Sequence, residues 1–198
     1  MSCYHSEVKN DAHDAHLIQQ YLSGDFASFE ALFSRHNDVL FRFVVSLGGP
    51  LEQAEDVVQR SWIQAVEHLH EYEDRGRFRS WLFRIAHRIW LNEVFTWWSR
   101  NTASMDGADG RDGPPLDHAV CRETPRNIAE KNEASEAFYQ ALNELSDELR
   151  RTVLLRIDAE LTFQEIADEM QCPLGTALWR MKEAEKRLKA KLRHSEYA

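Results

Sequence analysis

The sequence predicts an all-α protein in which two small helical domains are joined by a flexible linker. Apolar residues recur at three- and four-residue spacing over residues 14–100 and 133–194, which is the period of an amphipathic helix. That periodicity disappears over residues 101–132, where glycine, proline and aspartate are frequent. Such a segment is typical of a flexible acidic linker. The C-terminal domain is further predicted to contain a helix-turn-helix, because two short helical patterns meet there across a tight connection.

The composition points to a soluble globular protein, with 43% hydrophobic and 29% charged residues among 198. The formal net charge of −9 argues against a protein that holds DNA unaided through a strongly basic surface. It is compatible with a local basic face, or with DNA binding that depends on a larger partner. No apolar run is long enough to span a membrane, there is no signal-peptide core, and the three cysteines are widely separated. We therefore expect a cytoplasmic protein without disulfides.

Glycine delimits the first two predicted helices. Residues 1–13 are polar and are expected to fray, and the first apolar stripe begins after Asp14. Gly24 lies where that stripe ends, and the Gly-Gly-Pro segment 48–50 stops the second helix. His36 falls on the second apolar stripe, where we expect a buried, hydrogen-bonded histidine rather than a metal ligand.

The third predicted helix covers residues 51–70 and presents a polar outer face. A charged loop, residues 71–77, separates it from a fourth helix that begins near Phe78. This fourth helix is basic on one side and rich in aromatic residues, which suits single-stranded nucleic acid because bases stack on rings while cations follow the backbone. The alternative is a tryptophan-rich core helix with its arginines in solvent, and one helix can satisfy both interpretations.

The predicted helix-turn-helix covers residues 161–192. Thr162 lies three residues before Glu165, which is the capping-box spacing of a helix start. Pro173 suits the first turn of the next helix, because its missing N–H is not needed there. The apolar positions expected to face inward in this second helix are Leu174, Ala177, Leu178, Met181, Ala184 and Leu188. The opposite face carries Thr176, Arg180, Lys182, Lys186 and Arg187.

Two interpretations of that opposite face stay open at this point. The second helix of a helix-turn-helix enters the DNA major groove, where basic side chains contact phosphates and residues near the helix start contact base edges. A solvated helix with basic residues near its C-terminus would show the same charges, because the helix dipole favours them there.

Motifs in both predicted domains carry a resemblance to one family. Those of the first domain are Asp14, Leu17, Gly24, Asp25, Phe29, residues 54–59 with Trp62, and residues 78–82 with Ile85 and Ala86. Those of the second are Leu145, Arg151, Val153, residues 160–163, residues 165–167, Pro173, Gly175, Thr176, Arg180 and Ala184. In this order, with a linker between them, they resemble the bacterial extracytoplasmic-function (ECF) sigma factors, the initiation subunits of RNA polymerase.

The resemblance implies a protein that binds core RNA polymerase and directs promoter-specific transcription initiation. Residues 14–100 resemble the family's second conserved region, and residues 133–194 resemble its fourth region. The implied partners are core RNA polymerase, promoter DNA and an anti-sigma factor. We expect no enzymatic activity, no cofactor, no metal site and no membrane insertion, because no spacing of nucleophilic, phosphate-binding or metal-ligating residues is present.

The resemblance also assigns roles to individual residues. Polymerase binding is assigned to Glu55, Asp56, Gln59 and Trp62. Recognition and melting of the downstream (−10) promoter element are assigned to Tyr72, Arg75, Arg77, Arg79, Arg84, His87, Arg88 and Asn92. Recognition of the upstream (−35) element is assigned to Thr162, Thr176, Trp179, Arg180, Lys182 and Lys186.

Several residues depart from the family's pattern. Arg60 stands where an acidic residue is usual, and Arg88 and Asn92 replace the common Asn and Asp of the melting helix. In the last helix Leu178 and Trp179 replace a basic residue and a serine, and Glu183 also replaces an arginine. These changes predict an unusual promoter preference or weaker phosphate contacts, with Trp179 packing on a thymine methyl group or on another protein.

Two other functions fit parts of the pattern. One is a helix-turn-helix regulator that acts without polymerase, against which the acidic net charge and the segment from Glu55 to Trp62 both count. The other is a protein-interaction adaptor that has kept the fold but lost promoter recognition. Transcription from a defined promoter separates a sigma factor from both.

Overall fold

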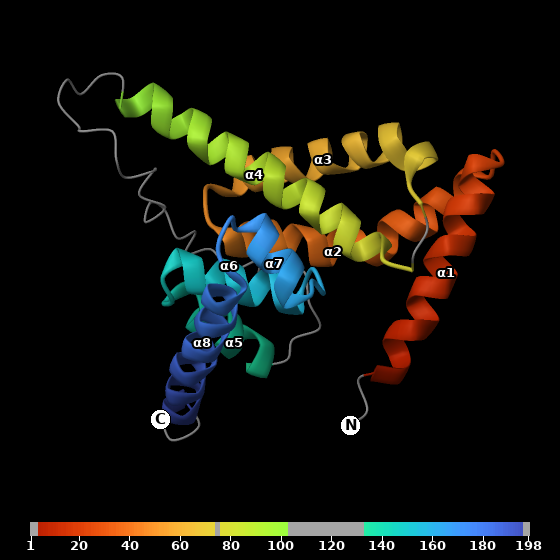
Figure 1. Ribbon diagram of the computed structural model, residues 1–198. Helices are drawn as coiled ribbons and strands as arrows, with labels where there is room; N and C mark the ends of the chain where they lie inside the picture. Colours follow the sequence, from red (N-terminus) through yellow and green to blue (C-terminus); the bar gives the residue numbers. More distant parts are fainter. Residues whose placement is uncertain (1–3, 74–75, 103–132, 196–198) are drawn as a thin grey trace.

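The computed structural model describes residues 4–73, 76–102 and 133–195, and every regular element in these ranges is helical (Figure 1). This confirms the predicted fold class. The elements are α1 (Tyr4–Leu22), α2 (Phe26–Leu47), α3 (Leu51–His68), the 3-10 helix η1 (Leu69–Glu71), α4 (Phe78–Thr102), α5 (Glu133–Asn143), α6 (Asp147–Ile157), α7 (Phe163–Glu169) and α8 (Leu174–Ser195). Residues 103–132 of the predicted linker, and Arg75, lie outside the described residues. No described helix is both long and apolar enough to cross a membrane.

The N-terminal core forms where α2, α3 and α4 meet. Phe43 of α2 and Phe83 of α4 are fully buried, with their ring centroids 5.0 Å apart. Leu82, Phe78 and Leu32 are also fully buried, as is Val57 of α3, so apolar side chains from three helices fill one core. Helix α1 covers one end of α2 (Figure 1).

Helix α1 begins well before the predicted start at Asp14. The backbone is helical from Tyr4, although the residues before Asp14 offer no continuous apolar stripe. Periodicity marks only the part of a helix that is buried, so it missed the polar extension. The predicted ends are confirmed, because α1 ends before Gly24, at φ 103°, and α2 ends before Gly48, at φ 106°.

A buried polar cluster ties α1 to α2. His36 Nε2 lies 2.8 Å from Asp14 Oδ2, and Arg35 forms an ion pair with the same carboxylate. Both His36 and Asp14 are buried. The prediction of a buried, hydrogen-bonded histidine at position 36 is therefore confirmed, and Asp14 is its partner.

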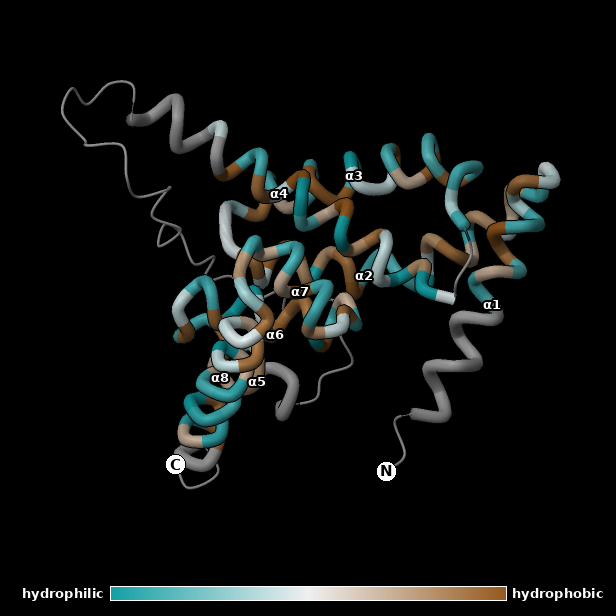
Figure 2. Tube along the Cα trace, in the orientation of Figure 1, coloured by the Kyte–Doolittle hydropathy of each residue, from teal (hydrophilic) through white to brown (hydrophobic). Residues whose placement is uncertain are grey.

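The C-terminal helices pack around α8, whose Ala177, Ala184 and Leu188 are buried. The capping box is confirmed, since the Thr162 hydroxyl accepts from the Glu165 amide and the Glu165 carboxylate accepts from the Thr162 amide. Pro173 precedes α8 instead of lying in its first turn. Its carbonyl accepts from the amides of Thr176 and Ala177 and so begins the helix. Figure 2 shows hydrophilic residues predominating along α8, interrupted by hydrophobic ones.

The two groups of helices are in contact with each other. Helix α7 lies against α4, and α6 lies beside α2 (Figure 1). Arg150 of α6 is buried and its Nη2 donates to the Leu47 carbonyl at 3.4 Å. The close approach of α4 to α7 decides the environment of most residues assigned to −10 recognition.

Candidate nucleic-acid interfaces and a docking groove

Five of the residues assigned to the −10 element lie on α4 or just before it. We call them the α4 basic face: Arg77, Arg79, Arg84, His87 and Arg88. His87 and Arg88 lie three and four residues after Arg84, and Arg77 lies seven before it, so these four share one helix surface, whereas Arg79 is off that spacing. In this structure that surface faces the C-terminal domain, where carboxylates of α7 and of the preceding loop meet it.

Glu165 pairs with the first part of this face. Arg77 donates from both terminal nitrogens to the two Glu165 oxygens, each at 2.7 Å. Arg84 Nη2 lies 3.3 Å from the same carboxylate. A bidentate guanidinium–carboxylate pair fixes orientation as well as charge, and it is the geometry by which arginine also binds phosphate.

Glu169 pairs with the second part of the face, one helical turn later. Its side chain is only 4% exposed and lies 3.1 Å from His87 Nδ1 and 3.2 Å from Arg88 Nη2. His87 itself is fully buried. Because an unpaired buried charge is costly, the ionised carboxylate of Glu169 needs His87 and Arg88 as partners while α4 and α7 are in contact.

Arg79 reaches the loop between α6 and α7. Its Nε donates to the Asp158 carbonyl at 2.6 Å, and its Nη1 lies 3.1 Å from a Glu160 carboxylate oxygen. The guanidinium also lies over the Phe83 ring, 5.4 Å from the centroid. All five members of the α4 basic face therefore have partners in the C-terminal domain.

The pKa values at this interface follow from burial and pairing. Burial alone would raise the pKa of Glu165, but hydrogen bonds from Arg77 and Thr162 outweigh it and lower the pKa to about 2. Burial likewise opposes the ionised form of Glu169, and hydrogen bonds from His87 and Arg88 lower its pKa below the ordinary value. Burial lowers the pKa of His87 in spite of Glu169, so the ring is neutral at pH 7 and donates from Nδ1.

Asp158 behaves in the opposite way to Glu165. Burial raises its pKa to about 6, although Arg79 and Arg42 lie near enough to oppose that shift. Burial also raises the pKa of its neighbour Tyr139 to about 12. The interface thus contains two carboxylates that resist protonation, Glu165 and Glu169, and one, Asp158, that accepts a proton in mildly acidic solution.

Tyr72 and Asn92, which are also assigned to the −10 element, lie outside the α4 basic face. Tyr72 packs on Trp81 at 4.9 Å and on Phe78 at 5.9 Å between ring centroids, and it is half-buried. Asn92 is exposed on α4. The assigned contacts of these residues with DNA remain predictions.

The residues assigned to the −35 element are mostly open to solvent. Trp179 is 61% exposed, and Lys182 and Lys186 are exposed on the same side of α8. Thr176 is half-buried, and Thr162 uses its hydroxyl in the α7 capping box.

Arg180 and two leucines differ from the sequence prediction. The Arg180 side chain is only 13% exposed and its Nη2 lies 2.8 Å from Glu148 of α6, so it points along the domain surface. Leu174 and Leu178 were expected to face inward, and this was wrong, since both are exposed. Three- and four-residue spacing shows that residues share a helix face, but it does not show which face is buried. In α8 the buried face is formed by Ala177, Ala184 and Leu188.

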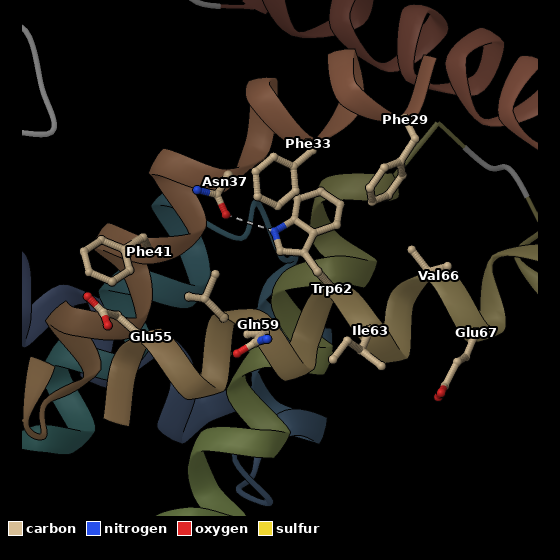
Figure 3. A pocket seen from close by; sticks show the side chains of 11 residues that line it. Phe29, Phe33, Asn37, Phe41, Glu55, Gln59, Trp62, Ile63, Val66 and Glu67 are labelled. Atoms are coloured by element: carbon tan, nitrogen blue, oxygen red, sulfur yellow. Dashed lines mark hydrogen bonds between the residues drawn. The ribbon is translucent and has the colours of Figure 1, made fainter. Parts of the chain in front are cut away.

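An apolar groove of about 550 Å³ lies between α2 and α3 (Figure 3). Of the residues assigned to polymerase binding, Glu55, Gln59 and Trp62 line it, whereas Asp56 is exposed outside it. Trp62 is only 6% exposed, and its Nε1 donates to Asn37 Oδ1 at 3.2 Å. Its indole therefore forms the floor of the groove between the phenylalanines of α2. Little of the indole surface is left for direct contact with a binding partner.

Sequence reasoning missed most of the groove's walls. They are Phe29, Phe33, Phe41, Val58, Ile63 and Val66. Ile63 carried a usable signal, because it is a large apolar residue on the polar side of α3, next to Trp62. Phe33 and Ile63 are exposed, so the groove offers apolar surface to a partner.

Arg60, the departure at the expected polymerase site, has a partner within the fold. It forms an ion pair with Glu93 of α4, and both side chains are partly exposed. The charge change at position 60 is therefore balanced locally by a residue of the neighbouring helix.

Two family models match the chain in order. One, described as Sigma-70 region 2, matches residues 32–103, and the other, described as Sigma-70, region 4, matches residues 135–188. The RNA polymerase sigma-H factor of Pseudomonas aeruginosa is 28% identical over 175 residues, which cover 86% of this chain and 91% of that protein. The ECF RNA polymerase sigma factor SigW of Bacillus subtilis is 23% identical over 179 residues, which cover 89% and 95%.

Solved structures share the fold. The sigma factor RpoE in complex with the anti-sigma factor NepR, from Bartonella quintana, superposes with a TM-score of 0.57 at 22% identity, covering 83% of this chain and 96% of that one. CnrH in complex with the cytosolic domain of CnrY gives a TM-score of 0.56 at 21% identity, covering 92% and 98%.

Proposed function

Because the chain belongs to the ECF RNA polymerase sigma factors and directs transcription to promoters, we propose that it docks on core RNA polymerase through the groove between α2 and α3. The single observation that carries this docking site is the apolar groove itself, with Glu55 and Gln59 on its rim (Figure 3). Such a groove fits an amphipathic helix with basic flanks, because the apolar floor takes its hydrophobic side and the acidic rim takes its charges. The helical partner that we propose is the clamp coiled coil of core polymerase, which the family's second region binds.

The two DNA-contacting surfaces divide the promoter between them. The α4 basic face serves the −10 element, where arginine fits phosphate and the half-buried rings of Tyr72 and Trp81 offer stacking surface to unstacked bases. The exposed side of α8 serves the −35 element in the duplex. Since the α4 basic face pairs with Glu165 and Glu169 in this structure, α4 and α7 must separate before DNA reaches it.

An anti-sigma factor is the further partner that we propose, since RpoE is similar in fold and its solved structure contains one. The protein would act in the cytoplasm, where core polymerase is found, and would perform no catalysis of its own. Polymerase supplies the chemistry, and this chain supplies the choice of start site.

Run-off transcription with bacterial core RNA polymerase on a library of genomic fragments tests the proposal. We expect discrete starts that require the protein, and we expect Ile63→Asp to weaken polymerase binding at least about tenfold by placing a charge in the apolar groove. Gln64→Asp is the matched control, because it adds the same charge to the exposed neighbouring position of α3.

The other outcomes point to the alternative functions. Polymerase binding without any starts would indicate an adaptor on the same fold. Neither starts nor polymerase binding would indicate a helix-turn-helix regulator that acts alone. Equal binding by wild type and the Ile63→Asp variant would move the polymerase site away from the groove.

A further inference from the structure

The exposed side of α8 combines apolar and basic side chains in one stripe. We call this stripe the recognition face: Gly175, Leu178, Trp179, Lys182 and Lys186. Leu178 is 45% and Trp179 is 61% exposed, while Ala177, Ala184 and Leu188 of the same helix are buried. The apolar residues of the recognition face are therefore not needed to hold α8 in its domain.

Gly175, the second residue of α8, leaves open space at the start of this face. A Cβ built at Gly175 would meet no atom of the described residues within 4 Å. A small residue beside two exposed apolar ones leaves room for a partner's surface at the start of α8.

The charges on and beside the face fit an anionic occupant. Lys182 and Lys186 are exposed on it, one and two turns after Leu178. The acidic residues nearby are paired within the helix, with Glu183 2.8 Å from Arg187 Nε and Glu185 3.4 Å from Lys189 Nζ. The second helix of a helix-turn-helix with this charge fits duplex DNA, whose phosphates take the lysines.

The apolar side chains of Leu178 and Trp179 call for an apolar group on the DNA. The recognition face contains no arginine, because Arg180 turns toward Glu148. It therefore lacks the bidentate arginine–guanine contact, which is the commonest specific one. In the major groove the apolar group that distinguishes one base from the others is the C5-methyl group of thymine.

We propose that Leu178 and Trp179 read thymine methyl groups in the −35 element, with Lys182 and Lys186 holding the flanking phosphates. This rests on the proposed function of the α8 surface. On this proposal the protein prefers thymine at defined positions of the −35 element. The preference comes from van der Waals contact instead of hydrogen bonds to guanine.

Deoxyuridine substitution tests this directly, because uracil keeps every hydrogen bond of thymine and lacks only the methyl group. Once a promoter has been identified by run-off transcription, each −35 thymine is replaced singly in synthetic duplexes. Holoenzyme binding is then measured. We expect one or two positions at which the replacement weakens wild-type holoenzyme about three- to fivefold, the value of one buried methyl group.

Variants of the face assign the effect to residues. In Trp179→Ala and Leu178→Ala holoenzymes the deoxyuridine effect at the matching position should disappear, since the methyl contact is already lost. Lys182→Ala is the contrasting variant, in which binding should fall at all promoters and become less salt-dependent while the deoxyuridine effect persists. Both apolar side chains are exposed, and circular dichroism verifies that their replacement leaves the fold intact.

Failure of this inference is distinguishable from failure of the proposed function. Promoter-specific starts with no deoxyuridine effect at any −35 position would overturn thymine-methyl reading and leave the sigma factor role standing. Unchanged promoter binding by the Trp179→Ala holoenzyme would also overturn it and assign the face to a protein partner. Absence of specific starts would instead overturn the proposed function.

Discussion

The α4 basic face and the recognition face of α8 are both suited to DNA, yet one is covered and the other is open. Arg77, Arg84 and His87 are paired with carboxylates of α7, whereas Trp179 and Lys182 face solvent. The covering carboxylates offer arginine the same oxygen geometry as phosphate. In the proposed function, the α4 basic face must exchange an internal anion for DNA, while the recognition face has only water to displace.

The two proposed promoter contacts therefore have different energetic costs. Contact through α8 needs no rearrangement of the chain. Contact through α4 requires the separation of α7, so its apparent affinity is the intrinsic affinity multiplied by the fraction of molecules in which α4 and α7 are separated. Each of the following experiments changes one side of this comparison.

The largest expected effect comes from removing the buried carboxylate. Glu169→Ala leaves the buried His87 N–H without its acceptor and should destabilise the α4–α7 contact by about 2 kcal/mol. Glu148→Ala removes an exposed carboxylate from an ion pair with Arg180 and should cost less than about 1 kcal/mol. Urea unfolding measures both. Equal costs would show that the interface pair is no more buried in solution than the surface pair.

Neutralising both covering carboxylates should uncover the α4 basic face. The double variant Glu165→Gln with Glu169→Gln should bind a labelled single-stranded oligonucleotide about tenfold more tightly than wild type, because less pairing energy is lost on opening. Fluorescence anisotropy at low salt measures this affinity. The control is Glu30→Gln with Glu52→Gln, which makes the same charge change at exposed positions of α2 and α3. An equal gain in the control would reduce the effect to net charge.

Acid should open the same contact over a defined range. Glu165 has a pKa of about 2 in the folded chain against an ordinary 4.5, so its contribution is complete above pH 4.5 and is lost as the pH falls through about 2. The distance between fluorophores on α3 and α8 should increase over that range in wild type and change less in Glu165→Gln. A constant distance down to pH 2, with helices intact, would contradict the assignment.

Asp158 provides the opposite pH dependence, which thermal unfolding detects. Its pKa is raised to about 6 from 3.8, so the stability it contributes is complete below pH 3.8 and is lost as the pH rises through about 6. Asp158→Asn should remove this loss while keeping the acid opening that Glu165 controls. Thermal unfolding between pH 4 and pH 7 separates the two carboxylates.

The smallest expected effect concerns the open face. Arg187→Ala breaks the exposed pair with Glu183 and should leave stability nearly unchanged, because solvent screens such pairs. It leaves a negative charge beside Lys182 and Lys186, so duplex binding should weaken about twofold. Filter binding on a −35 duplex measures this. Tighter binding by the variant would show that Arg187 does not offset Glu183.

The sequence alone determined the features that depend on neighbours along the chain. The capping box of Thr162 and Glu165, the stop at Gly48 and the buried position of His36 were all predicted, because caps, turns and helical faces follow from residues within four positions. The order of the two sigma regions was also readable, since it is a property of the chain itself.

Only the tertiary structure decided which polar groups meet across long separations. Glu165 pairs with Arg77, 88 positions earlier, and no local spacing identifies that partner. Arg180 lies on the expected side of α8 but turns to Glu148 of α6, and Leu178 has helical spacing but remains exposed, because α8 buries a narrower face than its pattern suggested. Periodicity states that a face is apolar, whereas packing between helices decides which face is covered and by what.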